Sequence, residues 1–215
     1  MAYYWGVDSA EEVSEDLYDL VEKEYGKPAY WGRYLAPIPG KVAGLSREEV
    51  HFIRNRGIKL LPVLSNVGEA IGYRAGKVVA QNAIYHARRL SIPKGRVVFG
   101  HLEKNSKVDE EWIRGYVDSM NPSGYKAGLY HSPDRGDFYK AYCAAVAKDN
   151  NVSSQLILWS AGPDQGPTRA RNAPNFRPKK PLCKANVWGW QYGRDARQCS
   201  IDTNLVNSRL YDLLW

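Results

Sequence analysis

The sequence predicts an α/β protein in which eight short strands and the helices between them close into a (β/α)8 barrel of the TIM type. Eight short apolar and aromatic runs recur along the 215-residue chain, and helical periodicity separates most of them. The last two runs leave little room for a helix, so the barrel should be irregular near strands 7 and 8. One domain, residues 1–215, suits this length. A doubly wound open sheet is the alternative. It is disfavoured because Asp8, rather than a glycine-rich phosphate turn, follows the first run.

The expected strands are short runs with aromatic and β-branched residues, and most of them end in a polar side chain. The first, YYWGVD, ends in a carboxylate, and the third contains Pro62, which cannot donate a hydrogen bond to a neighbouring strand. In chain order the strands are expected at residues 3–8, 28–34, 58–64, 96–103, 124–131, 155–159, 186–192 and 198–202.

Helices are expected between most of these strands, from hydrophobic periodicity and from start signals. Ser46 with Glu49, and Ser106 with Asp109, have the spacing of a capping box. In chain order the helices are expected at residues 10–25, 46–57, 71–90, a stretch beginning near 106 whose inner face carries Ile113, Tyr116, Val117 and Met120, and then 134–148 and 205–214.

Basic residues concentrate in residues 161–185, a proline-rich segment expected to form a long loop. The net charge of the chain is +7, and this loop carries Arg169, Arg171, Arg177, Lys179, Lys180 and Lys184. By default such a loop is solvated and partly disordered, but it could contact an anionic wall polymer or a carrier protein. Nucleic acid is not an expected partner, because Phe176 is the only aromatic residue in the loop that could stack on bases.

The three cysteines, Cys143, Cys183 and Cys199, have neither metal-site spacing nor the number for a disulfide framework. Cys183 and Cys199 could pair in an oxidising compartment, whereas Cys143 is expected in the core of a helical stretch. The N-terminus lacks the basic start and apolar run of a secretory signal. No stretch approaches the roughly 20 apolar residues needed to cross a bilayer. The expectation is a soluble protein that needs another export route, or a carrier, to act outside a cell or at its wall.

Polar and aromatic side chains stand at or just after the ends of nearly all the expected strands. They are Asp8, Arg33, Tyr34, Asn66, His101, Glu103, Tyr130, His131, Trp159, Gln191, Tyr192, Asp202 and Asn204. In a parallel barrel such positions converge on one rim. Together with 15 Tyr and 7 Trp, whose rings suit sugars, they predict a sugar-binding cleft. Asp8, His101, Glu103 and His131 could gather a metal, but their spacing is not a recognised signature, so no metal or cofactor is expected.

The order of seven short motifs resembles a glycoside-hydrolase-like domain, once catalogued only as a domain of unknown function, that is related to the family 25 lysozymes. The motifs are WGVDSA, YWGRY, VVFGHLE, GYKAGLYHS, LILWSAG, WGWQY and IDTN. The resemblance runs from about Tyr4 to Asn204. It implies a TIM-type barrel, a carboxylate ending the first strand and an acidic pair ending the fourth.

The resemblance also implies roles for individual residues. Glu103 corresponds to the general acid of family 25 lysozymes, while His101 stands where those enzymes have aspartate. The second catalytic role would fall to Asp8, Asp202 or the substrate's acetamido group, and His101 could orient that group or share a proton with Glu103. Substrate binding is expected from Arg33, Tyr34, Tyr130, Trp159, Gln191, Tyr192 and Asn204.

Three functions remain open on the sequence alone. The first is a lysozyme-like hydrolase that cleaves β-linked N-acetylated glycans, with peptidoglycan as the expected substrate and Glu103 as acid. The second is a cell-wall carbohydrate-binding barrel in which His101 marks the loss of turnover. The third is an effector or interaction protein that docks a partner through its basic loop.

Overall fold

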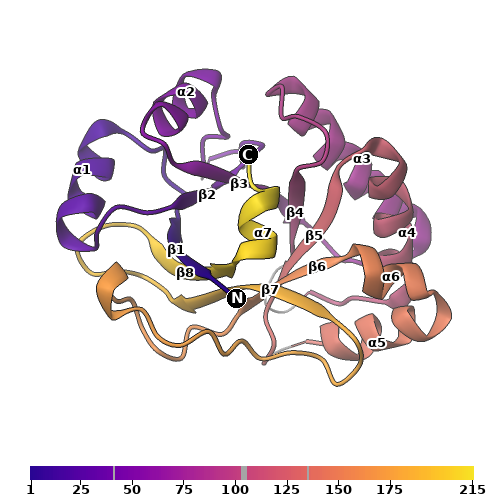
Figure 1. Ribbon diagram of the computed structural model, residues 1–215. Helices are drawn as coiled ribbons and strands as arrows, with labels where there is room; N and C mark the ends of the chain where they lie inside the picture. The colour runs from indigo at the N-terminus through magenta and orange to yellow at the C-terminus, as the bar shows by residue number, and fades with distance from the viewer. Residues whose placement is uncertain (41, 103–105, 135) are drawn as a thin grey trace.

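The computed structural model describes residues 1–40, 42–102, 106–134 and 136–215. The side chain of Asn66 also lies outside the described part of the molecule. Eight strands of this part form a closed barrel in sequence order (Figure 1). They are β1 Tyr3–Asp8, β2 Tyr30–Tyr34, β3 Lys59–Val67, β4 Val97–Leu102, β5 Lys126–His131, β6 Ile157–Ala161, β7 Asn186–Gly193 and β8 Asp202–Asn207. The predicted barrel class is therefore confirmed.

Helices cover the barrel unevenly. The described α-helices are α1 Glu15–Glu24, α2 Arg47–Asn55, α3 Tyr73–Arg89, α4 Glu110–Met120, α5 Phe138–Lys148, α6 Asn150–Gln155 and α7 Ser208–Leu213. Helices α1 and α2 lie on one side of the barrel, and α3 to α6 lie on the other (Figure 1). None of these helices is both long and apolar enough to cross a membrane.

Strand β8 is the irregular element that the sequence predicts only in outline. An eighth strand at residues 198–202 and a helix from residue 205 are wrong, because β8 covers Asp202–Asn207 and α7 begins at Ser208. β8 runs antiparallel to both β7 and β1. The connection of residues 194–201 is too short for the crossover that a parallel pair requires, so the chain turns back as a hairpin. Asp202 therefore begins its strand, at the rim where β1 to β7 end.

Two of the predicted helix starts can be compared with the structure. Ser46 caps α2, and its Oγ accepts a hydrogen bond from the Glu49 backbone N–H at 3.0 Å. The Glu49 carboxylate does not complete the capping box, because it binds groups elsewhere in the core. For α4 the predicted start at Ser106 is wrong: Asp109 is the cap, and its Oδ1 accepts from the Trp112 N–H at 2.7 Å.

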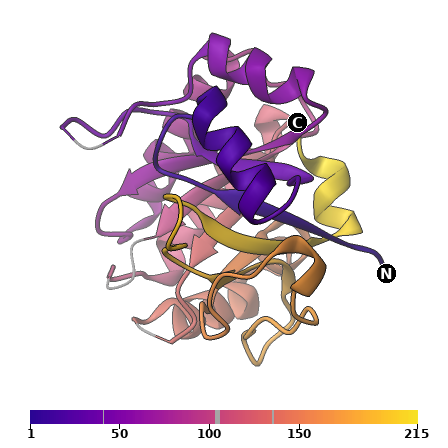
Figure 2. The ribbon, with the colours of Figure 1, turned by 90° about the vertical axis from the view of Figure 1, so that its left-hand side faces the viewer.

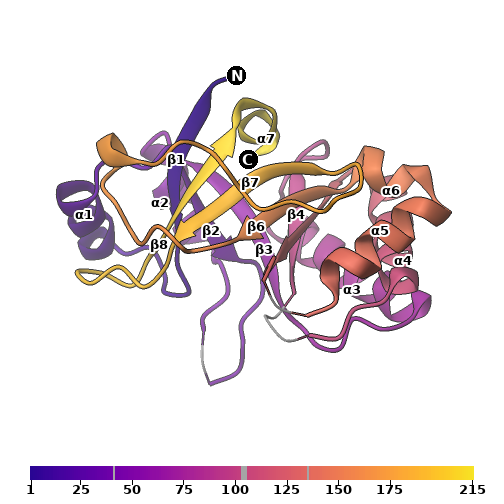
Figure 3. The same cartoon turned by 90° about the horizontal axis from the view of Figure 1, so that it is seen from below.

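The two ends of the barrel differ. Helix α7 and both chain termini lie at the end where β1 begins (Figure 3). Leu210 and Leu214 are buried there among the barrel residues, and the Leu60 N–H donates to the carbonyl of Trp215 at 2.8 Å. At the opposite end, where β1 to β7 finish, the polar side chains of the rim line the opening of the barrel.

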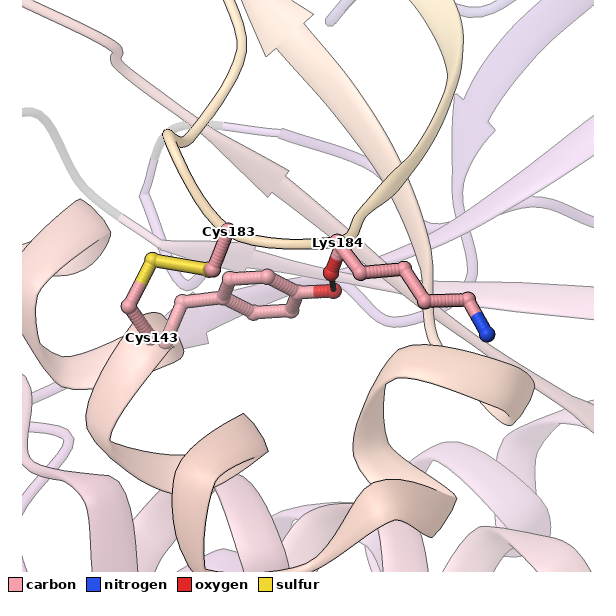
Figure 4. Close-up of a disulfide and its surroundings, with 4 residues drawn as sticks. Cys143, Cys183 and Lys184 are labelled. Atoms are coloured by element: carbon pink, nitrogen blue, oxygen red, sulfur yellow. Dashed lines mark hydrogen bonds between the residues drawn. A yellow bond between two sulfur atoms is a disulfide. The ribbon is translucent and has the colours of Figure 1, made fainter.

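The basic loop of residues 161–185 is tied to the barrel and is not solvated along its whole length. Cys183 forms a disulfide with Cys143 on α5, with a Cα–Cα distance of 5.7 Å (Figure 4). The pairing of Cys183 with Cys199, which the sequence left open, does not occur, and Cys199 is a free thiol. Next to the disulfide, the Tyr142 hydroxyl donates to the Lys184 carbonyl at 3.0 Å.

Further contacts hold the remainder of this loop. The Ala170 N–H donates to the carbonyl of Tyr25 at 2.7 Å, next to the C-terminus of α1, so the loop and α1 share one face of the molecule (Figure 2). Phe176 stacks on Tyr3 with ring centroids 4.8 Å apart. Lys179 forms ion pairs across the rim with acidic residues that follow β5 and β6. The loop therefore takes the place of a covering helix between β6 and β7.

Candidate active site

A cavity of about 470 Å³ opens at the rim where β1 to β7 end. Residues at the ends of most strands line it: Asp8 and Ser9, Gly32 and Tyr34, His101 and Leu102, Tyr130, Trp159, Gln191 and Asp202. Gly32 is needed at this place, since a Cβ there would lie 2.7 Å from the Cβ of Asp8 and 3.5 Å from the Trp159 ring. The absence of that side chain leaves room for Asp8 and Trp159 at the cavity floor.

Two carboxyl groups face each other across β1 and β8. Asp8 and Asp202 are register partners in the antiparallel pair. One amide bridges them, because Gln191 Nε2 donates to Asp8 Oδ1 at 3.1 Å and to Asp202 Oδ2 at 2.9 Å. Asn204 Nδ2 also donates to Asp8 Oδ1, at 2.6 Å. The two shorter hydrogen bonds to Asp8 thus end on Oδ1, and Gln191 Nε2 is 3.5 Å from Oδ2, so a proton on this carboxyl belongs on Oδ2.

The orientations of the two amides are fixed by the groups behind them. Gln191 Oε1 accepts from the Tyr130 hydroxyl at 2.9 Å and from Arg194 Nη2 at 3.0 Å. Asn204 Oδ1 accepts from Trp159 Nε1 at 3.0 Å. With their oxygens occupied by donors, both amides must present N–H groups to the carboxyl pair. Gln191 and Asn204, which the sequence suggests as substrate contacts, are therefore buried groups that hold the carboxyls.

The surroundings of the two carboxyl groups give them different pKa values. Burial, reinforced by the negative charge of Asp202, raises the pKa of Asp8 from 3.8 to about 8. Burial also raises the pKa of Asp202, to about 6. The Asp195 N–H and the Arg194 guanidinium favour the charged form of Asp202, so they oppose this rise. Near neutral pH the pair therefore keeps one proton, chiefly on Asp8. A pair of this kind offers an acid and a carboxylate side by side.

The raised pKa of Asp8 predicts a pH-dependent stability. Between about pH 4 and pH 8 the folded chain binds more protons at Asp8 than the unfolded chain, so stability falls as pH rises through this window. Asp8→Asn removes this effect while keeping the acceptor for Asn204. We expect the variant to lose less stability than wild type between pH 4 and pH 8, so that at pH 8 it is the more stable of the two, with the difference fading toward pH 4.

Urea unfolding at both pH values measures this difference. Asp212→Asn is the matched control, because Asp212 is exposed and belongs to α7, at the end of the barrel opposite the pair (Figure 3). If the free energies of unfolding of wild type and Asp8→Asn change in parallel with pH, the buried-proton interpretation is wrong.

Aromatic side chains form one wall of the cavity. The Tyr34 hydroxyl and His101 Nδ1 are 3.2 Å apart, and their rings are nearly parallel. His101 packs edge-on against Tyr130 at 4.5 Å, and Tyr130 packs against Trp159 at 4.8 Å. This series of rings runs from β2 to β6 and suits the flat face of a sugar. The predicted acid, Glu103, lies outside the described residues.

Three residues that the sequence predicts at the substrate-binding rim make their contacts within the core of the fold instead. Arg33 is fully buried, and its Nη2 donates to Glu49 Oε2 at 3.1 Å, so its charge is neutralised within the fold. The Tyr192 hydroxyl accepts from Trp5 Nε1 at 2.8 Å on the side of β7 opposite Gln191. His131 is buried against Phe138, and burial lowers its pKa to about 3, so it is a neutral core residue.

Arg194 lines the cavity but is missing from the sequence-based candidates. It follows β7 in the turn to β8, and only the hairpin, which the sequence did not predict, brings it back over the pair. Among the described residues, no group of three or more His, Cys, Asp or Glu side chains is arranged to hold a metal ion.

Comparisons with known proteins agree with this architecture. A family model described as an Rv2525c-like, glycoside hydrolase-like domain matches residues 27–206. An uncharacterized B. stearothermophilus protein of known structure is 48% identical, with a TM-score of 0.96 over 99% of this chain and 100% of that chain. No curated protein matches the chain.

More distant structures share the fold. A family GH25 lysozyme from Aspergillus fumigatus is 11% identical, with a TM-score of 0.58 over 99% of both chains. The autolysin LytC from Streptococcus pneumoniae, solved in complex with a synthetic peptidoglycan ligand, is 14% identical. Its TM-score is 0.60, and the match covers 95% of this chain and 47% of that chain. The chain has the barrel of the family 25 lysozymes and belongs to the Rv2525c-like, glycoside hydrolase-like family.

Proposed function

We propose that this protein is a glycoside hydrolase that cleaves β-linked N-acetylated glycans, with bacterial peptidoglycan as its substrate. The observation that carries the proposal is the Asp8–Asp202 pair, which retains one proton near neutral pH at the floor of an aromatic-walled cavity. Membership of a glycoside hydrolase-like family supports it, as does the fold shared with an autolysin that binds a peptidoglycan ligand.

The roles follow from what cleavage of a glycosidic bond requires. Glu103 protonates the leaving oxygen, as in the lysozymes that the sequence resembles. Asp202 stays ionised and stabilises the positive charge that develops on the sugar ring in the transition state. Asp8 keeps its proton on Oδ2 and donates a hydrogen bond into the cavity, where the acetamido group of the substrate is the natural acceptor. Tyr34 and Tyr130 pack against the sugar faces.

Removal of the acid tests the proposal. Purified peptidoglycan is incubated with wild type or Glu103→Gln, and the reducing ends released are counted. We expect release by wild type and a loss of about 100-fold or more in Glu103→Gln, because general acid catalysis contributes about that much. Glu69→Gln, at an exposed position, is the matched control and should match wild type. Equal release by wild type and Glu103→Gln would exclude the assigned acid.

The second candidate function is a barrel that binds wall glycan without turnover. The observation that favours it is His101, which stands in the aromatic wall beside Tyr34, at the place where family 25 lysozymes carry a carboxylate. This candidate predicts that wild type and Glu103→Gln both pellet with insoluble peptidoglycan and that neither releases reducing ends.

We further propose that the protein works outside the cytosol, at the cell wall. The Cys143–Cys183 disulfide supports this location, because disulfides persist in oxidising compartments. A contact of the basic loop with an anionic wall polymer or a carrier protein stays a prediction. Arg171, Arg177, Lys180 and Lys184 are exposed cations of this loop that such a contact would use.

A further inference from the structure

The two carboxyls of the pair share the side-chain amide of Gln191 but differ in their other neighbours. Asp8 and Asp202 are register partners and share the N–H donors of Gln191. The other hydrogen-bond partner of Asp8 is the uncharged amide of Asn204. Asp202 has a cation beside it, since Arg194 Nε lies 3.8 Å from Asp202 Oδ2. This cation lies in ion-pair contact with Asp202, and it is one of two groups that favour a negative charge on Asp202, the other being the Asp195 backbone N–H.

Several contacts fix the position of Arg194. Its Nη2 donates to the Tyr130 hydroxyl at 2.9 Å and to Gln191 Oε1 at 3.0 Å. The next residue in the turn, Asp195, donates its backbone N–H to Asp202 Oδ1 at 2.8 Å. The side chain of Arg194 is 34% exposed, so its charge acts in a partly desolvated setting. The turn from β7 to β8 thus delivers both a cation and a backbone donor to Asp202.

We propose that Arg194 is a positioning residue that, together with the Asp195 backbone N–H, holds the negative charge of the pair on Asp202 and leaves the proton on Asp8. The catalytic consequence of this assignment rests on the proposed function. The assignment itself concerns only the distribution of one proton within the folded chain.

The other titratable groups near the pair do not supply this asymmetry. Burial raises the pKa of both Tyr30 and Tyr130, so these hydroxyls stay uncharged. Asp195 is exposed, and its negative charge works against ionisation of Asp202. Arg33 also lines the cavity, but its charge is paired with Glu49. Among the described residues that face the pair, Arg194 is the cation left to direct the charge.

Carbon-13 NMR titration of the aspartate carboxyl carbons tests the proposal without any substrate. Spectra of Asp8→Asn and Asp202→Asn assign the two signals. In wild type we expect the lower titration step chiefly on Asp202 and the upper step chiefly on Asp8. In Arg194→Met the midpoint of Asp202 should rise by about 1 pH unit, and each carbon should then report both steps.

Three further variants complete the test. Arg194→Gln also removes the charge but keeps an N–H donor for Tyr130, so it serves if Arg194→Met does not fold. Arg194→Lys restores a cation and should return the Asp202 midpoint most of the way to its wild-type position. Arg197→Met is the control, because Arg197 is an exposed arginine of the same turn. An Asp202 midpoint that moves no further in Arg194→Met and Arg194→Gln than in Arg197→Met overturns the proposal.

The titration and the sugar-release assay fail independently. A shifted titration with no sugar release by wild type would leave the role of Arg194 intact and refute the hydrolase. Sugar release with an unshifted titration would refute the role of Arg194 alone.

Discussion

Replacing Glu49 by alanine is expected to destabilise the fold by about 3–5 kcal/mol. Both side chains of the Arg33–Glu49 ion pair are buried, and two oxygens of Glu49 accept from the guanidinium. Glu49 Oε1 also accepts from the backbone N–H of Val13 at 2.9 Å. Removal of the carboxylate leaves the Arg33 cation in the core with backbone carbonyls as its remaining partners. Such an uncompensated charge is far more costly than the loss of packing alone.

Urea unfolding at neutral pH measures this loss. Glu48→Ala is the matched control, since Glu48 is the exposed neighbour on the same helix and its loss should cost well under about 1 kcal/mol. The double variant Arg33→Met, Glu49→Leu should recover most of the stability, because it removes both charges together. A loss in Glu49→Ala no larger than in Glu48→Ala would show that the buried pair does not hold β2 to α2.

Asp202→Asn is expected to lower glycan hydrolysis about 100-fold while leaving glycan binding in place. In the proposed mechanism Asp202 is the charge that stabilises the oxocarbenium-like transition state, and an amide cannot supply that charge. The initial rate of reducing-end release from peptidoglycan measures the first effect, and co-sedimentation with the insoluble polymer measures the second.

The control for this variant is Asp212→Asn, whose exposed side chain lies outside the cavity. Wild-type rates in Asp202→Asn would remove Asp202 from the mechanism. A parallel loss of rate and of sedimentation would assign it to substrate binding instead.

Most of the barrel could be predicted because each strand is a short apolar run and each run between β1 and β6 is followed by a periodic helix or a long loop. The eighth strand could not. The run at residues 198–202 has the composition of a strand, but Asp202 begins β8. Antiparallel pairing in that hairpin depends on contacts with β1 and β7, which local sequence does not encode. The sequence predicts the correct rim for Asp202, but it does so by putting this residue at the end of a parallel strand, whereas Asp202 begins an antiparallel one.

The rim residues show a second limit of sequence reasoning. Successive strand residues point to opposite faces, so of Tyr130 and His131, or of Gln191 and Tyr192, only one can enter the cavity. The sequence alone did not decide which one. The structure turns Tyr130 and Gln191 inward. Arg33 presents the related difficulty that its partner, Glu49, lies on another element.

Cys143 and Cys183 illustrate the same limit over a longer range. Their separation of 40 residues carries no signal for pairing, whereas Cys183 and Cys199 are closer in sequence. The structure joins the distant pair because α5 packs beside the returning basic loop (Figure 4). Pairing therefore followed from tertiary packing, which spacing does not report.

The central claim is that the cleft works with Asp202 ionised and Asp8 protonated, and the pH dependence of peptidoglycan hydrolysis tests it most directly. With pKa values of about 6 and about 8 for these groups, the wild-type rate should fall on both sides of neutral pH. Asp8→Asn carries an N–H donor in place of the carboxyl proton at every pH, so it should stay active and lose the part of the alkaline fall that Asp8 causes. Deprotonation of the general acid Glu103 should still lower the rate at higher pH. An Asp8→Asn profile that still falls above pH 8 as wild type does, or an enzyme inactive at every pH, would contradict the account.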